Sequence, residues 1–446
     1  MDLHELSVTQ AAEGIRKREV SPVELVEALL GRIEALEPEL KAWVVVDHEG
    51  ALAAAKRCEQ EAHGDKPLGA LHGVPLGVKD IFHAAGLTTT CGSPIFQHRL
   101  APHDATSVAR LRQAGAVVLG KTVTVQFAHF DPPPTRNPWN YDRTPGGSSS
   151  GSAAAVASRM IPAGLGSQTG GSILRPAAYC GTVGLKPTYG RISRFGVTPA
   201  SWSLDHVGHL TRTVEDAALL LQVMAGHDPK DQASSPVPVG DYLEAARKRD
   251  SAPRLGFVLD EERLATPEVV DHLRQIANRF ERAGAEVREV RFPVPMSEIQ
   301  AVRSLVCEVE ASAVHTPLHR EHAELYGPEI RAVVEVGQLL PSAVYIQAQR
   351  LRRKWRPQVK KMLEGVDCLL MPTVYNVAPD PSTTGSSTFQ APWSLFGQPA
   401  ISLPSGLSHE GLPLAIQLVA PHFREETLLS AAAWCEAVLD PMPSPC

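Results

Sequence analysis

The sequence lacks the cysteine and histidine patterns of redox and metal proteins. Its seven cysteines, at positions 58, 91, 180, 307, 368, 435 and 446, are odd in number and include no CxxC pair. We therefore expect reduced, mostly buried thiols, and no redox centre or zinc knuckle. There is also no HExxH segment and no clustered spacing of histidine and cysteine. The sequence thus predicts neither a metal nor a cofactor.

Long apolar runs and an excess of basic charge are also missing. No stretch of 18 consecutive apolar residues occurs, and the first 20 residues do not show the basic-then-apolar pattern of a signal peptide. The net charge of -6 gives no basic surface that would attract phosphate backbones. We therefore expect a cytoplasmic protein that acts on small molecules, without nucleic acid or membrane. A homodimer remains open.

What the sequence does contain indicates one large α/β body. With 446 residues, 43% of them hydrophobic, the chain can bury a large core. Ser21 and Pro22 begin a helix over about 22–37, because apolar residues then recur at helical spacing. The segments GVPLGVKDI and AVVLGKT are typical of short buried strands, and a helical stretch at 104–114 separates them. This alternation predicts a βαβ unit.

Two loops rich in glycine and serine follow. Residues 132–152 form a loop before the helical segment SAAAVASRM, and GSQTGGS forms a second loop after the apolar run MIPAGLG. Both serine turns therefore lie at the ends of elements, where active sites gather. Further along, residues 226–253 are typical of a surface connection. Residues 267–293 show the pattern of a helix followed by a strand, and residues 297–362 show the pattern of helices that we expect to cover a pocket.

Three residues in these segments suggest nucleophilic catalysis. Lys79 lies in GVPLGVKD, and Ser148 and Ser172 lie 24 residues apart in the two glycine turns. If the three side chains meet, an uncharged lysine can take a proton from one serine through the other, which activates a nucleophile. The backbone N–H groups of the TGGS turn, from Thr169 through Gly170 and Gly171 to Ser172, can converge on a developing oxyanion.

The sequence around these positions resembles the amidase signature family of serine hydrolases. The resemblance runs through SPVELVEALLGRIEAL, GVPLGVKD, NPWNYDRTPGGSSSGSAAAVA, TGGSILRPAAYCGTVGLKPTYGRIS and SLDHVGHLTRTVEDAALLL, and returns in GQPAISLPSG and GLPLAIQLVAP. These segments cover most of the chain outside roughly 226–360.

The resemblance implies a single α/β domain over 1–446, built around a large twisted mixed sheet flanked by helices. Residues 66–220 are its catalytic signature core, and 297–362 are a helical region that covers the pocket. Ser172 is the implied nucleophile, Ser148 the relay after a cis peptide bond, and Lys79 the base, with Thr169 to Ser172 as oxyanion hole. Burial has to lower the pKa of Lys79 for this chemistry, so we expect activity to rise toward alkaline pH.

Several positions depart from the family pattern and bear on the substrate. Gln168 occupies a position where many members have aspartate, and Ser150 one where glycine is usual. Leu174 occupies a position where they have arginine, and the arginine of this chain, Arg175, lies one residue later. We therefore do not transfer the substrates of better-known subfamilies.

For the substrate itself, we expect His129, Phe130 and Gln168 to contribute to binding, and the loop with Tyr375 and Trp393 to influence specificity. Asp205 and His206 are expected to hold the signature loops by hydrogen bonds. No charged residue is obviously placed to bind a substrate carboxylate. We therefore expect hydrolysis of neutral or aryl amides, with esters and carbamates as an extension.

Three other interpretations remain open. Gly147 to Gly151 matches the GxSxG elbow of α/β-hydrolases, with Ser149 as nucleophile, although no strand is expected directly before it. The chain could instead be the amidase component of a tRNA-dependent amidotransferase, which would need partner subunits. A catalytically silent binding protein on the same scaffold is the third.

Overall fold

A mixed sheet forms the centre of the molecule. The computed structural model describes residues 2–64, 66–249, 251–258 and 264–445, and within them eleven strands join one sheet. The strands are β1 (Trp43–Val46), β2 (Pro75–Lys79), β3 (Val117–Thr122), β4 (Ala163–Gln168), β5 (Val183–Lys186), β6 (His206–Thr211), β7 (Arg254–Val258), β8 (Glu286–Val290), β9 (Cys368–Pro372), β10 (Ala400–Leu407) and β11 (Pro413–Val419). Their order across the sheet is β1-β3-β2-β4-β6-β5-β10-β11-β9-β7-β8.

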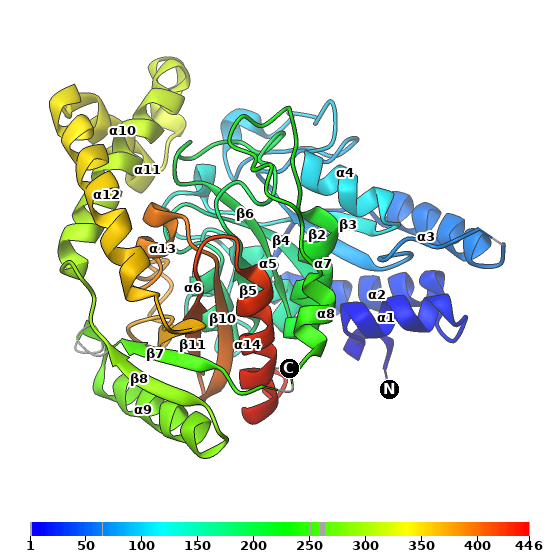
Figure 1. Cartoon of the computed structure of the whole chain (residues 1–446). Coiled ribbons are helices and arrows are strands. Elements are labelled where there is room, and N and C mark those ends of the chain that lie inside the picture. Colours follow the sequence, from blue (N-terminus) through cyan, green and yellow to red (C-terminus); the bar gives the residue numbers. More distant parts are fainter. Residues whose placement is uncertain (1, 65, 250, 259–263, 446) are drawn as a thin grey trace.

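Helices flank this sheet along its length (Figure 1). They are α1 (Val8–Arg16), α2 (Pro22–Leu40), α3 (His48–Ala62), α4 (Thr106–Gln113), α5 (Ser150–Ala157), α6 (Leu174–Cys180), α7 (Val214–Met224), α8 (Tyr242–Arg247), α9 (Pro267–Arg282), α10 (Met296–His322), α11 (Pro328–Leu339), α12 (Ser342–Met362), α13 (Ala391–Phe396) and α14 (Glu425–Val438). Short 3-10 helices lie at η1 (Leu3–Glu5), η2 (Pro94–Phe96), η3 (Gln126–Ala128) and η5 (Ala323–Leu325). The predicted α/β fold with a large mixed sheet is confirmed.

Strand pairing places two functional segments at one edge of the sheet. β2 pairs in parallel with β3, and α4 connects them, which confirms the βαβ unit. β2 also pairs in parallel with β4 on its other side. Lys79 ends β2 and Gln168 ends β4. Because parallel strands have their carboxyl ends at the same edge, the turn after β4 begins beside Lys79.

Local sequence signals account for the helices near this edge. The Ser21 hydroxyl accepts the N–H groups of Val23 and Glu24, so α2 begins where the sequence predicts. In α5, which consists of small residues, a side chain on Gly151 would collide with backbone atoms of Ala42 and Val123. Glycine at this position therefore lets α5 lie directly against the backbone at the end of β3.

The two predicted serine loops are shorter than the sequence suggests. The loop expected over 132–152 ends at Ser149, because α5 begins at Ser150. In the GSQTGGS segment, Gly166, Ser167 and Gln168 continue β4, which pairs with β6 as far as Gln168. The apolar run before them therefore extends as a strand, and only Thr169 onward turns.

The segments after the signature core also match their predictions in outline. Residues 267–293 contain α9 and β8, and 297–362 lie in α10, α11 and α12, which stand together on one side of the sheet (Figure 1). α10 packs against α11, α12 and α13. The surface connection at 226–253 differs in containing the short helix α8.

The predictions about cysteines and about membrane-spanning segments can be compared with the described part of the chain. Its six cysteines are all buried and free, which confirms the prediction of reduced, buried thiols for them; Cys446 lies outside the described residues. None of the described helices has the length and apolar character needed to cross a bilayer.

Candidate active site

Lys79 is fully buried and bonded to hydroxyl groups alone. Its Nζ lies 2.7 Å from the Oγ of Ser148, 3.0 Å from that of Ser149 and 2.8 Å from that of Ser167. Within the described residues, no carboxylate forms an ion pair with it. Burial lowers the pKa of Lys79 well below its ordinary value, because a charged ammonium there would lose its hydration. A neutral amine has two N–H groups and one lone pair, so it can accept a proton from one of the three hydroxyls.

Ser148 follows a cis peptide bond, as expected. The bond joins Gly147 and Ser148. Arg175, fully buried on α6, donates from Nη2 to the Gly147 carbonyl at 2.6 Å and to the Thr384 hydroxyl at 3.2 Å. Its Nη1 donates to the Gly385 carbonyl. Arg175 therefore fixes the backbone that presents Ser148 to Lys79.

Ser172 lies next to this pair at the start of α6. Its carbonyl accepts the N–H of Ser149 at 3.3 Å, which links the two serine turns directly. Its side chain is largely buried, with 7% of its surface exposed. The structure records no hydrogen bond from the Ser172 hydroxyl to any described residue, Ser148 included. The Lys79 to Ser148 contact is thus formed, whereas no contact between the Ser148 and Ser172 hydroxyls is recorded within the described residues.

The turn before Ser172 carries open backbone donors. In the described structure, the N–H groups of Gly170, Gly171 and Ser172 donate to no other protein group. A side chain on Gly171 would come within 2.4 Å of the Gln390 Oε1, so the missing side chain lets the turn lie close to Gln390. Open N–H groups beside a nucleophilic hydroxyl are the arrangement that stabilises an oxyanion.

The side chains of Gln168 and Asp205 hold this turn from behind. The Gln168 carbonyl oxygen accepts the N–H groups of Ile173 and Leu174 at 3.0 and 3.1 Å, and its amide nitrogen donates to Ser394. Gln168, which we expected to bind substrate, is fully buried and bonded to the protein at both ends. Asp205 accepts the Thr169 hydroxyl at 2.6 Å and two backbone N–H groups. The prediction that Asp205 holds the signature loops is confirmed.

Comparison with known proteins assigns the family. The sequence profile of the Amidase family matches residues 24–429. The chain belongs to the amidase signature family. It is 38% identical over 477 aligned positions to a protein of Geobacter metallireducens that is named as a glutamyl-tRNA(Gln) amidotransferase subunit, with 97% of each chain covered. The alignment is longer than this 446-residue chain, so that relative carries insertions that this amidase lacks.

Solved structures of amidases share the fold. A chain from a vestigial protein complex, described with the evolutionary origins of an s-triazine catabolic enzyme, superposes with a TM-score of 0.92 at 31% identity, covering 97% of this chain and 98% of that one. A bacterial aryl acylamidase of the amidase signature family gives 0.89 at 26% identity, covering 98% and 97%.

These relatives correct one prediction. We expected an enzyme for small-molecule amides, esters or carbamates, with no nucleic acid. Other relatives, 36–39% identical, are likewise named as glutamyl-tRNA(Gln) amidotransferase subunits. The expectation of a small-molecule substrate alone, without nucleic acid, is therefore wrong, because these relatives are named as subunits of an amidotransferase of glutamyl-tRNA(Gln). The prediction of no nucleic acid was based on the net charge of this chain. That charge does not describe the surface of a complex in which partner subunits take part.

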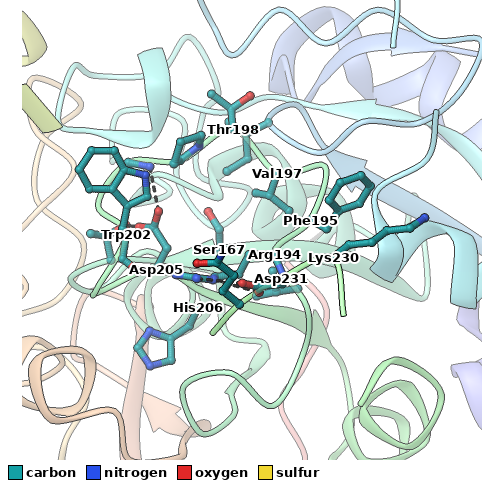
Figure 2. Close-up of a pocket in the computed structure, with 16 residues that line it drawn as sticks. Ser167, Arg194, Phe195, Val197, Thr198, Trp202, Asp205, His206, Lys230 and Asp231 are labelled. Carbon is teal, nitrogen blue, oxygen red and sulfur yellow. Dashed lines mark hydrogen bonds and ion pairs between the residues drawn. The ribbon is translucent and has the colours of Figure 1, made fainter. Parts of the chain in front are cut away.

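A cavity of about 320 Å³ lies against the Thr169 side of the turn (Figure 2). Ser167, Thr169 and Asp205 line it, together with Arg194 and Trp202 from the loop before β6. Lys79, Ser148 and Ser172 are not among its lining residues, whereas Ser167, which contacts Lys79, is one of them. Its charges are compensated in part, because Arg194 pairs with Asp231 at 3.0 Å.

The other predicted substrate residues lie near η3 and α13. His129 is buried, with ring centroids 6.2 Å from Phe130 and 5.8 Å from His315 of α10. Burial, followed by the charges of His315 and Arg303, lowers the pKa of His129 well below its ordinary value. Trp393 is fully buried in the core, which leaves it no exposed surface for a substrate.

Sequence reasoning missed several residues of the site. Ser167 contacts Lys79 without having been predicted, and Ser149, which the sequence suggested only as the nucleophile of a GxSxG elbow, contacts Lys79 as well. Arg175 is visible in the motif, yet its bond to the Gly147 carbonyl depends on how α6 docks. Arg303, which lies beside Gly170, comes from α10, and no local pattern connects it with the turn.

The Ser149 elbow is not supported by the observed backbone. Ser149 is fully buried, and no strand precedes it in the described chain, since residues 123–149 contain only η3. Its hydroxyl contacts Lys79 and accepts the N–H of Ser167. No histidine in the described part of the chain bonds to it. This geometry and the family assignment both disfavour an α/β-hydrolase.

Proposed function

We propose that this amidase hydrolyses carboxamide C–N bonds through an acyl-enzyme on Ser172, with Ser148 as relay and Lys79 as base. The observation that supports this most is the bond between the buried Nζ of Lys79 and the Ser148 hydroxyl. It lies at the sheet edge where the turn with open N–H groups begins. The role of Thr169 to Ser172 as oxyanion hole is part of the same proposal.

In this mechanism, the Ser172 Oγ attacks the substrate carbonyl carbon. Its proton passes to the Ser148 oxygen while the Ser148 proton passes to the neutral Lys79 Nζ. The carbonyl oxygen becomes an oxyanion held by backbone N–H groups. When the C–N bond breaks, the proton returns through Ser148 to the leaving nitrogen. Water then attacks the acyl-enzyme by the same relay, releasing the acid and restoring Ser172.

The relatives favour a role as the amidase component of a tRNA-dependent amidotransferase, which would release ammonia from an amide donor. The names of the sequence relatives support this role. A direct test is to express the chain with the other subunits of such an enzyme and to measure glutaminase activity. Activity that needs the partner subunits supports the role, and full activity of the chain alone contradicts it.

An aryl amidase is a second candidate, supported by the similarity to the aryl acylamidase structure. Esters and carbamates would then share the acyl-transfer path. A hydrolysis screen across primary amides, anilides, esters and carbamates distinguishes the candidates. Cleavage of primary amides without anilides or carbamates removes the second one.

Ser172→Ala is the blank for either candidate, and we expect it to abolish turnover. In wild type, kcat/KM should rise with pH through the lowered pKa of Lys79, because only the neutral amine accepts a proton. A Ser172→Ala protein that retains turnover, or a rate independent of pH, contradicts the proposed chemistry.

A further inference from the structure

We propose that Arg303 binds a carboxylate of the amide substrate, so that this site selects amides that carry a negative charge. The proposal rests on Ser172 being the nucleophile and adds a binding residue and a substrate class. It also reverses the expectation that no charged residue is placed for a carboxylate.

Arg303 is buried, and its charge offsets part of the burial effect that raises the pKa of Glu308 on the same helix, but the two residues form no ion pair. It lies on α10 with 7% of its surface exposed, and no ion pair involves it within the described residues. Its one recorded side-chain bond runs from Nη2 to the hydroxyl of its neighbour Ser304 at 3.1 Å, and its Nε has no partner. A guanidinium offers five N–H donors. Leaving such a group buried and unpaired is costly, so the arrangement suits an anion that arrives with the substrate.

Other buried arginines in this chain are bonded much more fully. Arg191 donates to the Tyr242 hydroxyl and to the carbonyls of Val237 and Pro238. Arg352 donates to the Leu395 carbonyl and to both oxygens of Ser203. These side chains are held by the fold. Arg303 differs from them in having donors that the protein leaves open.

The open donors lie beside the catalytic turn. A side chain on Gly170 would begin 3.8 Å from the Nη1 of Arg303, and Gly170 is two residues from Ser172. The charge of Arg303 also acts on neighbouring groups. Burial is the main cause that lowers the pKa of His129, and the charge of Arg303 lowers it further. Burial likewise lowers the pKa of Arg175 to about 10, and Arg303 contributes to this shift. A carboxylate beside Arg303 would therefore lie close to both the turn and His129.

Other buried polar atoms around the turn lack partners as well. The Nε2 of His129 and the Oε1 of Gln390 have none within the described residues, and Gln390 borders Gly171. Polar atoms of this kind are normally satisfied in folded proteins, so a group of them beside a nucleophile indicates a polar ligand. Arg303 supplies the positive charge of this group.

The position of Arg303 limits the length of the substrate. Two residues span at most about 7 Å, so a carboxylate beside Gly170 is only a few bonds from a carbonyl at Ser172. Amides of this length include glutamine and the monoamides of short dicarboxylic acids. The planar fork of arginine can bind such a carboxylate through two parallel hydrogen bonds, which lysine cannot reproduce.

The test compares succinamate, which carries the carboxylate, with butyramide, its neutral counterpart. We expect wild type to prefer succinamate, and Arg303→Gln to raise the KM for succinamate about 100-fold while changing butyramide hydrolysis less than about threefold. Arg303→Lys should recover part of the loss. Arg320→Gln, at an exposed position on the same helix, is the matched control and should change neither substrate.

Binding measurements keep the test independent of turnover. Calorimetry on Ser172→Ala protein should detect succinamate but not butyramide, and adding Arg303→Gln should remove the succinamate signal. The melting temperature of Arg303→Gln should not fall, whereas an arginine with a structural role would lower it. Equal effects on both amides, or no preference for succinamate in either assay, would overturn the proposal. Turnover that survives in Ser172→Ala would instead refute the catalytic role of Ser172.

Discussion

Two fully buried lysines lie on neighbouring parallel strands, and their surroundings differ. Lys79 ends β2 and contacts three serine hydroxyls. Lys121 on β3, which pairs with Val78 of β2, bonds to the Asp80 carboxylate at 2.8 Å. Burial lowers the pKa of both lysines, strongly for Lys79, while the Asp80 charge offsets part of the effect on Lys121.

This difference shows that burial alone does not make a lysine a base. At Lys121 the carboxylate stabilises the ammonium form, so the residue serves as half of an ion pair. At Lys79 the hydroxyls stabilise either form of the amine, and none of them adds a charge. The amine can therefore lose and regain a proton. The site around Lys79 is suited to catalysis, and the one around Lys121 to holding the strand ends together.

The largest effect should come from removing the proposed base. Lys79→Met should lower kcat about 10²- to 10⁴-fold, because the relay from Ser148 then has no acceptor. The measurement is steady-state hydrolysis of a responsive amide at a fixed pH. The control is the double variant Lys121→Met with Asp80→Asn, which removes the other buried lysine together with its partner. Equal losses in both would show that the two lysines have the same role.

A second large effect should appear in stability at the ion pair. Asp80→Asn leaves Lys121 charged in the interior, with the Thr89 hydroxyl and the Thr88 carbonyl as its remaining partners. We expect the free energy of unfolding to fall by about 3–5 kcal/mol. Asp440→Asn is the matched control, because its pair with Arg279 is exposed and should contribute little to stability. Urea unfolding measures both, and similar losses would contradict the comparison.

Smaller losses of activity should distinguish the hydroxyl groups around Lys79 from one another. Ser148→Ala should lower kcat about 100-fold because it removes the relay. Ser149→Ala should cost less than about tenfold, since it removes one hydrogen bond to Lys79 and two to the Ser167 backbone. The same amide assay measures both variants. A larger loss in Ser149→Ala would revive Ser149 as the nucleophile of a GxSxG elbow.

How much of the fold and of the candidate site can be predicted from the sequence depends on how many residues each sequence pattern spans. The helix at α2 and the strands β2 and β3 follow from caps and apolar runs within a few residues, so the sequence predicts them. The βαβ connection then brings Lys79 to the edge where the serine turns lie. The roles that we propose for Ser148 and Ser172 come from the family resemblance.

Contacts between distant elements were not predictable in the same way. Arg303 approaches Gly170 because of how α10 packs against α13 and the neighbouring helices, and the position of a packed helix is set by contacts along its whole length. Gln168 looked available for substrate, but its amide satisfies the first N–H groups of α6. Ser167 contacts Lys79 only because β4 extends further than the glycine-rich sequence suggests.

The smallest effect is a dependence of stability on pH. Folded Lys79 has a pKa well below its ordinary value, whereas an unfolded lysine titrates near 10.4. Between these values the unfolded chain binds one more proton, so stability rises with pH by up to about 1.4 kcal/mol per pH unit. Lys79→Met lacks this contribution. Urea unfolding of both proteins at several pH values should therefore show that the free energy of unfolding of the wild type increases relative to that of the variant as pH rises.

The subtraction isolates Lys79 because other titrating groups are common to both proteins. Lys186, whose pKa burial lowers to about 7, affects wild type and variant equally and cancels. The same subtraction at Lys121, with Asp80→Asn included, should show the rise over a narrower pH range, because the carboxylate favours the charged form in the folded state. Parallel pH profiles for wild type and Lys79→Met would mean that Lys79 keeps its proton when buried, and hydroxyl groups would then compensate a charge as well as Asp80 does.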